Sequence, residues 1–137
     1  MTALFTAKAT AKGGRSGHIA SDDGILDYDL VMPNEKKGGE TGTNPEQMFA
    51  AGYAACFGGA LELVAKKQGI DLESEVEGRV SLIKDESDGG FKIGVQLVVS
   101  AGGLEKEKAE ELVKAAHEFC PYSKATRGNI DVDLQVK

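Results

Sequence analysis

The chain has 137 residues, of which 41% are hydrophobic and 28% are charged, and its formal net charge is −6. This length and composition are typical of a single soluble globular domain with its own hydrophobic core. The acidic balance and the scattered lysines and arginines argue against nucleic acid or an anionic membrane as a partner. The first residues lack the continuous apolar core of a signal peptide, so we expect one cytoplasmic domain over residues 1–137.

Two strands are predicted in the first third of the chain. Residues 4–11 alternate weakly between apolar and polar side chains, and residues 26–32 alternate more clearly. The segments 12–17 and 21–24 carry the glycines and polar residues of turns. The polar residues 33–43 predict an exposed, mobile loop that leads into a helix.

A long helix is predicted to begin after Asn44, because asparagine suits the N-cap and Pro45 the first helical position. No charged residue occurs between Met48 and Leu61, so this helix should be buried, and Gly69 is a suitable C-terminal stop. The helix is rich in glycine and alanine, which predicts that something packs very close to it, such as another copy of the same helix.

The second half of the chain predicts a hairpin, a helix and a closing strand. Residues 75–84 and 91–99 alternate as a strand pair around a turn. Residues 104–119 place Leu112, Ala115, Ala116 and Phe119 on one apolar stripe, and Pro121 ends the helix. With a last strand over residues 130–136, the order is ββαββαβ, and the predicted class is α+β.

The two cysteines, Cys56 and Cys120, are the residues most able to carry chemistry. A thiol in an apolar helix is more often an inert core residue, and burial alone would raise its pKa. A nearby positive charge would reverse that shift, and Arg15 on its glycine-rich turn is the best candidate to supply one. Cys120 sits at a helix end before Pro121, where the last turn frays and a thiol can move.

Two other arrangements of the same residues are possible. His117 and Cys120 share a helix face, and together with His18 and Cys56 they would make four zinc ligands. Three separate regions would have to converge for this, without a CxxC anchor, so the sequence does not favour a metal site. A cysteine–histidine pair with His117 or His18 as base also lacks a local signature. Glu46 needs no function, since it already stabilises the helix dipole.

Four motifs, taken together, resemble the organic hydroperoxide resistance proteins of the OsmC-like superfamily. They are Gly13-Gly14-Arg15, Thr43-Asn44-Pro45-Glu46-Gln47, Ala50-Ala51-Gly52-Tyr53-Ala54-Ala55-Cys56-Phe57 and Cys120-Pro121-Tyr122-Ser123-Lys124-Ala125-Thr126-Arg127-Gly128-Asn129. The resemblance runs from the first strand to the last. It implies an OsmC-like fold in which antiparallel sheets wrap around central helices in an intertwined homodimer.

The resemblance also implies a thiol peroxidase without a cofactor. Cys56 would be the peroxidatic cysteine, Cys120 the resolving one, and Arg15 and Glu46 the ion pair beside the reactive thiol. Phe49, Phe57 and Tyr122 are candidates for an apolar pocket that selects alkyl and fatty-acid hydroperoxides. The reductant implied by the family is the lipoyl group of a lipoylated protein.

Helix geometry raises the question of which subunit supplies the ion pair. Glu46 and Cys56 are ten residues apart, which is roughly 15 Å along a straight helix. We therefore expect the Arg15–Glu46 pair of one subunit to serve Cys56 of the other. The alternative functions are a small-molecule or lipid-peroxide binding module without turnover, and a zinc-binding structural protein.

Overall fold

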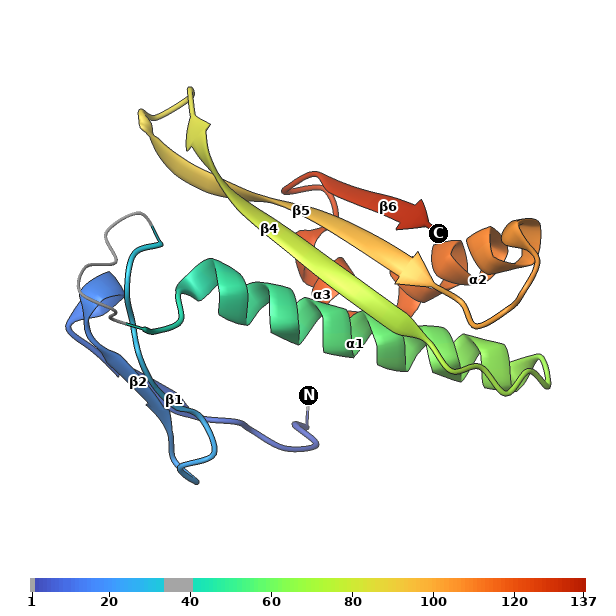
Figure 1. Ribbon diagram of the computed structural model, residues 1–137, viewed down its shortest axis with the longest axis horizontal. Coiled ribbons are helices and arrows are strands. Elements are labelled where there is room, and N and C mark those ends of the chain that lie inside the picture. The colour runs from blue at the N-terminus through green and yellow to red at the C-terminus, as the bar shows by residue number, and fades with distance from the viewer. Residues whose placement is uncertain (1, 34–40) are drawn as a thin grey trace. The chain divides into compact units, whose positions relative to one another are not determined.

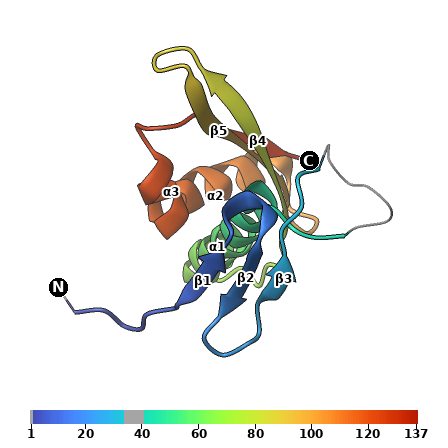
Figure 2. The same ribbon diagram turned by 90° about the vertical axis from the view of Figure 1, so that its left-hand side faces the viewer.

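The computed structural model describes residues 2–33 and 41–137, and the chain divides into two compact units, Met1–Met48 and Phe49–Lys137 (Figures 1 and 2). Residues 34–40 of the predicted loop lie outside the described residues. The elements, in chain order, are β1 (Ala9–Lys12), the 3-10 turn η1 (Gly14–Ser16), β2 (His18–Ser21), β3 (Asp27–Asp29), α1 (Pro45–Lys67), β4 (Glu75–Asp85), β5 (Gly90–Ser100), α2 (Lys106–Phe119), α3 (Pro121–Thr126) and β6 (Val132–Val136).

The first unit contains a three-stranded antiparallel sheet in the order β1-β2-β3. Both predicted strands exist but are shorter than expected, and β2 between them was not predicted. Strand β2 is four residues long and lies directly between two turns, so it is too short for an alternating pattern to identify it. The turn into β2 requires glycine at Gly17, because a Cβ there would lie 1.8 Å from the Lys12 carbonyl oxygen.

Helix α1 begins and ends as the sequence predicted. The Asn44 side chain accepts a hydrogen bond of 2.8 Å from the Gln47 backbone N–H, which is the N-cap interaction. At the other end Gly69 takes a positive φ of 74°, and the N–H groups of Gly69 and Ile70 donate to the carbonyls of Lys66 and Ala65. This pair of bonds is a Schellman motif, which satisfies the last carbonyls of the helix.

The second unit contains a three-stranded sheet in the order β4-β5-β6. The predicted β4–β5 hairpin is confirmed over its full length (Figure 1). The expectation of purely antiparallel sheets is wrong for β6, which pairs parallel to β5 because α2 and α3 carry the chain back between them. The register forms apolar rows across the sheet: Val76, Val99 and Val136 in one, and Val80, Val95 and Val132 in another.

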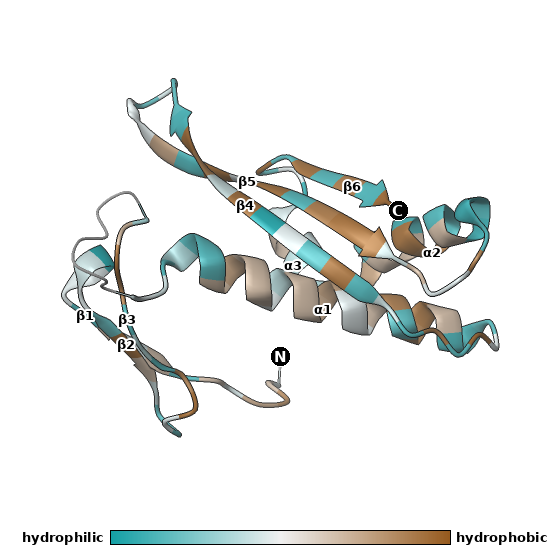
Figure 3. Cartoon of the chain, viewed as in Figure 1, coloured by the Kyte–Doolittle hydropathy of each residue, from teal (hydrophilic) through white to brown (hydrophobic). Residues whose placement is uncertain are grey.

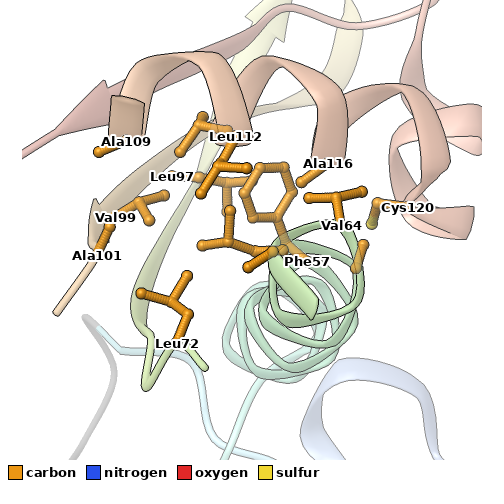
Figure 4. Close-up of a cluster of buried hydrophobic side chains, with 14 of the residues drawn as sticks. Phe57, Val64, Leu72, Leu97, Val99, Ala101, Ala109, Leu112, Ala116 and Cys120 are labelled. Atoms are coloured by element: carbon orange, nitrogen blue, oxygen red, sulfur yellow. The ribbon is translucent and has the colours of Figure 1, made fainter. Parts of the chain in front are cut away.

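Helices α1 and α2 lie on the same side of this sheet, and the core fills the space between them and β5 (Figures 2 and 4). Phe57, Leu97 and Leu112 meet there with no exposed surface. The C-terminal half of β5 is the strongly hydrophobic part of the sheet, as Figure 3 shows. Apolar periodicity identified β5 and α2 as core-forming elements, and the uncharged run identified α1.

Two details at the end of α2 differ from the sequence prediction. Phe119 is not part of the buried stripe: its side chain is exposed, and Lys67 lies 5.1 Å above its ring. Pro121 ends α2 as predicted, but it also occupies the first turn of α3, a helix that the sequence analysis missed. Proline is well suited to that position because it lacks only an N–H that would have no partner there.

The small residues of α1 allow close packing within the chain. A Cβ at Gly52 would lie 2.5 Å from the Tyr122 hydroxyl, so the Tyr122 side chain fills the space that this glycine leaves. Strand β4 also approaches closely, since a Cβ at Gly78 would lie 2.7 Å from the Ala50 carbonyl oxygen. Gly59, in contrast, faces open space. The close packing predicted from composition is therefore met in part by α3 and β4.

Of the helices in residues 2–33 and 41–137, α1 is long and apolar enough to cross a membrane by length and composition alone. The core helix of a soluble protein satisfies the same criterion. Tyr53, Phe57, Leu61 and Val64 of α1 are buried in the core of the second unit, but only 33% of the apolar window is buried, so the prediction of a buried helix is correct for one face of α1 only.

Candidate active site

The second unit brings Cys56 and Cys120 together. Cys56 lies in the middle of α1 and is half-buried, whereas Cys120, at the junction of α2 and α3, has no exposed surface. Both thiols are free, and the Cys120 side chain is near enough to interact with the Cys56 thiol. The arrangement is therefore one accessible thiol with a second, enclosed thiol beside it.

The surroundings of Cys56 raise the pKa of its thiol above the ordinary value. Burial is the main cause, the Tyr122 backbone acts in the opposite direction, and the Cys120 thiol raises the pKa further. None of these groups of the second unit is a fixed positive charge. A reactive thiolate at Cys56 therefore needs a positive charge that its neighbours in the second unit do not supply.

Aromatic side chains lie near the two thiols. The rings of Phe49 and Tyr122 meet edge to face at 5.7 Å, and Tyr53 lies 5.5 Å from Tyr122. Tyr122 packs over Gly52, which is one helical turn before Cys56. Two of the three predicted pocket residues, Phe49 and Tyr122, therefore cluster on the face of α1 that carries Cys56.

Phe57 lies elsewhere. Its ring has no exposed surface and packs in the core between α1, α2 and β5 (Figure 4). Consecutive residues of a helix point about 100° apart, so the neighbour of a site residue commonly faces the core. The position of Phe57 indicates a structural role.

A buried polar network lies beside the cysteines, and sequence reasoning did not find it. The Tyr53 hydroxyl lies 2.8 Å from Ser123 Oγ and 3.2 Å from Thr126 Oγ1, and Ser123 Oγ lies 2.8 Å from His117 Nδ1. Ser123 and Thr126 belong to motifs visible in the sequence, but nothing in the pattern connects them to Tyr53, seventy residues earlier.

Arg15 and Glu46 form a bidentate ion pair within the first unit. The Arg15 guanidinium donates to both carboxylate oxygens of Glu46, at 3.0 and 2.7 Å. This hydrogen bonding lowers the pKa of Glu46, whose side chain is only 14% exposed. The pair fixes the guanidinium in one orientation while 44% of the Arg15 side chain stays exposed, so a bound anion could still reach it.

His18 also lies in the first unit and bonds to two carboxylates. Its Nδ1 is 2.7 Å from Asp29 Oδ1, and its Nε2 bonds to Asp27. These contacts raise the pKa of His18, and both ring nitrogens can donate to the two carboxylates only when each carries a proton. A histidine in this state is neither a general base nor a metal ligand.

The described part of the chain, residues 2–33 and 41–137, contains no group of three or more histidine, cysteine, aspartate or glutamate side chains placed to hold a metal ion. The two histidines of the zinc hypothesis are engaged in other contacts. His117 bonds to Ser123, and His18 bonds to two aspartates.

Comparison with known proteins identifies relatives along almost the whole chain. The model of the family described as OsmC-like protein matches residues 37–135. Organic hydroperoxide resistance protein OhrB of Bacillus subtilis is 76% identical over 135 residues, which are 98% of this chain and 99% of that protein.

Solved structures give the same result for the fold. The crystal structure of OhrB of Bacillus subtilis superimposes with a TM-score of 0.96 at 74% identity, over 98% of this chain and all of that one. An organic hydroperoxide resistance protein from Legionella pneumophila has a TM-score of 0.90 at 50% identity, with 99% of each chain covered. The chain belongs to the OsmC-like family, as one of its organic hydroperoxide resistance proteins.

Proposed function

We propose that the protein is a cysteine-based peroxidase that reduces organic hydroperoxides and so defends the cell against oxidative stress. The observation that carries this proposal is the pair of free thiols, half-buried Cys56 beside fully buried Cys120. The names of the relatives, organic hydroperoxide resistance proteins, support the substrate class.

The proposed reaction has three steps. The Cys56 thiolate attacks the distal oxygen of the hydroperoxide; the O–O bond breaks, an alcohol leaves after protonation, and Cys56 becomes a sulfenic acid. The Cys120 sulfur then attacks the Cys56 sulfur and releases water. A dithiol reduces the resulting disulfide by exchange. We infer that this dithiol is a lipoyl group on a lipoylated protein.

Arg15, oriented by Glu46, would supply the positive charge that Cys56 lacks in the second unit. The bidentate pair presents an oriented guanidinium, which would lower the pKa of the thiol and polarise the peroxide. We infer that the pair reaches Cys56 from the partner subunit of a homodimer. Phe49 and Tyr122 would form the apolar wall for the alkyl chain.

We also propose that the two units act together as one OsmC-like domain over residues 1–137 in the cytoplasm. The family match supports this because it extends across the division between the units. Crystal structures of relatives over nearly the whole chain are in keeping with a soluble protein.

Thiol titration and intact mass measurement test the proposal directly. One equivalent of cumene hydroperoxide should remove both free thiols and leave the mass of an internal Cys56–Cys120 disulfide. The Cys120→Ser variant should stop at a Cys56 sulfenic acid, and Cys56→Ser should not turn over. Survival of both thiols would eliminate the peroxidase and leave a binding module, which would bind hydroperoxide without consuming it in the presence of a dithiol.

A further inference from the structure

We propose that Tyr53, Ser123 and His117 are positioning residues that hold Cys120 in place for its condensation with the sulfenic acid of Cys56. The inference rests on the proposed function and extends it to three residues that take no part in the reaction steps proposed above. Their contacts connect α1, α2 and α3, the three helices that meet at the cysteines.

The contact between His117 and Ser123 closes the chain around Cys120. Each of the two residues is three positions from Cys120, one at the end of α2 and the other in α3. Their side chains meet at 2.8 Å, and Arg127 Nη2 donates to the His117 carbonyl at 2.6 Å across the same junction. Cys120 therefore lies at the apex of a turn that hydrogen bonds hold closed.

Tyr53 ties this turn to the helix that carries the other thiol. Its hydroxyl is 2.8 Å from Ser123 Oγ, and both side chains are fully buried. Tyr53 precedes Cys56 by three residues, so the two lie about one turn apart on neighbouring positions of α1. The network thus fixes Cys120 relative to Cys56 through a short, enclosed path.

The directions of the hydrogen bonds follow from counting protons. The Thr126 hydroxyl has a single proton, which it donates to the Ser123 carbonyl, so it accepts from Tyr53. Tyr53 has then used its proton and accepts from the Ser123 hydroxyl. Ser123 Oγ must in turn accept from His117, whose Nδ1 therefore carries a proton.

The step that depends on this placement balances without another reactant. The S–O bond of the Cys56 sulfenic acid breaks, the S–S bond to Cys120 forms, and the thiol proton leaves with the oxygen as water. The approach requires the Cys120 sulfur to lie in line with the S–O bond. Since Cys120 is enclosed by protein on all sides, its backbone position decides whether that alignment is reached.

The first test separates the two chemical steps in the Tyr53→Phe variant. With cumene hydroperoxide, formation of the Cys56 sulfenic acid should keep its normal rate. Disulfide formation should slow about tenfold, in keeping with the loss of the buried hydrogen bonds that the Tyr53 hydroxyl makes with Ser123 and Thr126, and a sulfenic-acid trap should capture more of the intermediate. Tyr28→Phe, which removes a hydroxyl from β3, is the matched control. An unchanged rate of disulfide formation in Tyr53→Phe would overturn the proposal.

A second pair of variants tests the direction of the His117 bond. Asparagine at this position keeps an N–H donor. Aspartate has a similar shape, but its ionised carboxylate can accept hydrogen bonds and cannot donate them. His117→Asn should therefore keep disulfide formation close to normal, and His117→Asp should slow it as Tyr53→Phe does. A mere loss of packing would affect both variants alike, and equal rates in the two would contradict the network.

The equilibrium of the Cys56–Cys120 pair in glutathione buffer provides a test that needs no peroxide. Tyr53→Phe and His117→Asp should shift it about tenfold toward the dithiol, whereas His117→Asn should not. If the unmodified protein failed to react with hydroperoxide, the proposed function would fail, and this equilibrium would still decide on the network. An unshifted equilibrium in both variants would refute it.

Discussion

The two histidines of the chain, His18 and His117, lie in surroundings that push their pKa values in opposite directions. Hydrogen bonds to Asp29 and Asp27 raise the pKa of His18. Burial, together with the nearby charge of Arg127, lowers the pKa of His117. Both side chains are engaged in hydrogen bonds, His18 with two aspartates and His117 with Ser123, although sequence alone kept both open as a general base.

We predict that the two imidazole titrations lie on opposite sides of the ordinary histidine value of about 6.5. Proton NMR of the ring Cε1–H signals would show this, and the His117→Asn variant would assign them. Asp29→Asn should move the His18 midpoint down and leave that of His117 unchanged. Coincident midpoints, or the reverse order, would contradict the surroundings that the structure gives these side chains.

The same shifts predict the sign of the pH dependence of stability. The stabilisation from His18 is fully present below about pH 6.5 and is lost as the pH rises through the raised pKa of the folded protein. For His117 the folded protein resists protonation, so stability is lost as the pH falls from about 6.5 through the lowered pKa. Denaturant unfolding of His18→Gln and His117→Asn across this range would separate the two contributions.

At the residue scale, the two cysteines could be singled out from the sequence, whereas the contacts beside them could not. Cys56 and Cys120 are conspicuous because the chain has only two cysteines and both lie in recognisable motifs. Tyr53, Ser123 and Thr126 are ordinary residues, and their contacts form because α1 and α3 meet in space. Sequence spacing does not reveal such a contact, because it describes neighbours on one element only.

At the element scale, length decided which predictions were correct. The β4–β5 hairpin has a long alternating pattern, and helix α1 has a long uncharged run with clear end signals. The bounds of both were predicted to within a residue or two. Strand β2 and helix α3 are four and six residues long, and both exist because neighbouring structure holds them. Short elements of this kind lack enough residues to show a period, so tertiary contacts override local pattern.

Two glycines of α1 should respond in opposite ways to substitution by alanine. Gly59 faces open space, so Gly59→Ala should stabilise the protein by up to about 1 kcal/mol through helix propensity. In Gly52→Ala the new methyl group would meet the Tyr122 hydroxyl at 2.5 Å and displace the ring that packs beside Cys56. That displacement should offset the gain in stability.

Thermal unfolding of the two variants measures the difference in stability, and the rate of Cys56 alkylation measures the local effect. We expect Gly59→Ala to unfold at higher temperature with an unchanged alkylation rate. Gly52→Ala should show no such gain, and its Cys56 should become more accessible as Tyr122 moves. Equal stabilisation and equal thiol reactivity in both variants would mean that Tyr122 adjusts without leaving the site.

At the scale of the whole molecule, the first unit has little core of its own. Ile19 and Leu30 are its buried apolar side chains among the described residues, whereas Leu4, Phe5 and Ile25 are largely exposed. A unit of this kind gains stability by covering its apolar surface. A homodimer would provide that cover, and light scattering should then report a mass about twice the 14.4 kDa of the chain.

The subunit that supplies the ion pair can be identified by mixing two inactive variants. Glu46 and Cys56 are ten residues apart, which is roughly 15 Å along a straight helix. If Arg15 and Glu46 serve the partner, a heterodimer of Arg15→Ala and Cys56→Ser chains contains one complete site, because the intact Cys56 meets the intact Arg15. If they serve their own chain, neither site is complete.

Co-expression of the two chains with different affinity tags would isolate the heterodimer. Its hydroperoxide reductase activity should approach half that of the unmodified dimer, while each parent homodimer remains nearly inactive. The control pairs Arg15→Ala with Glu46→Ala, which disable the same ion pair in both chains and leave no complete site when the pair acts across subunits. An inactive Arg15→Ala/Cys56→Ser heterodimer of normal stability would place the ion pair and the thiol in one chain, and α1 would then have to bend between Glu46 and Cys56 during catalysis.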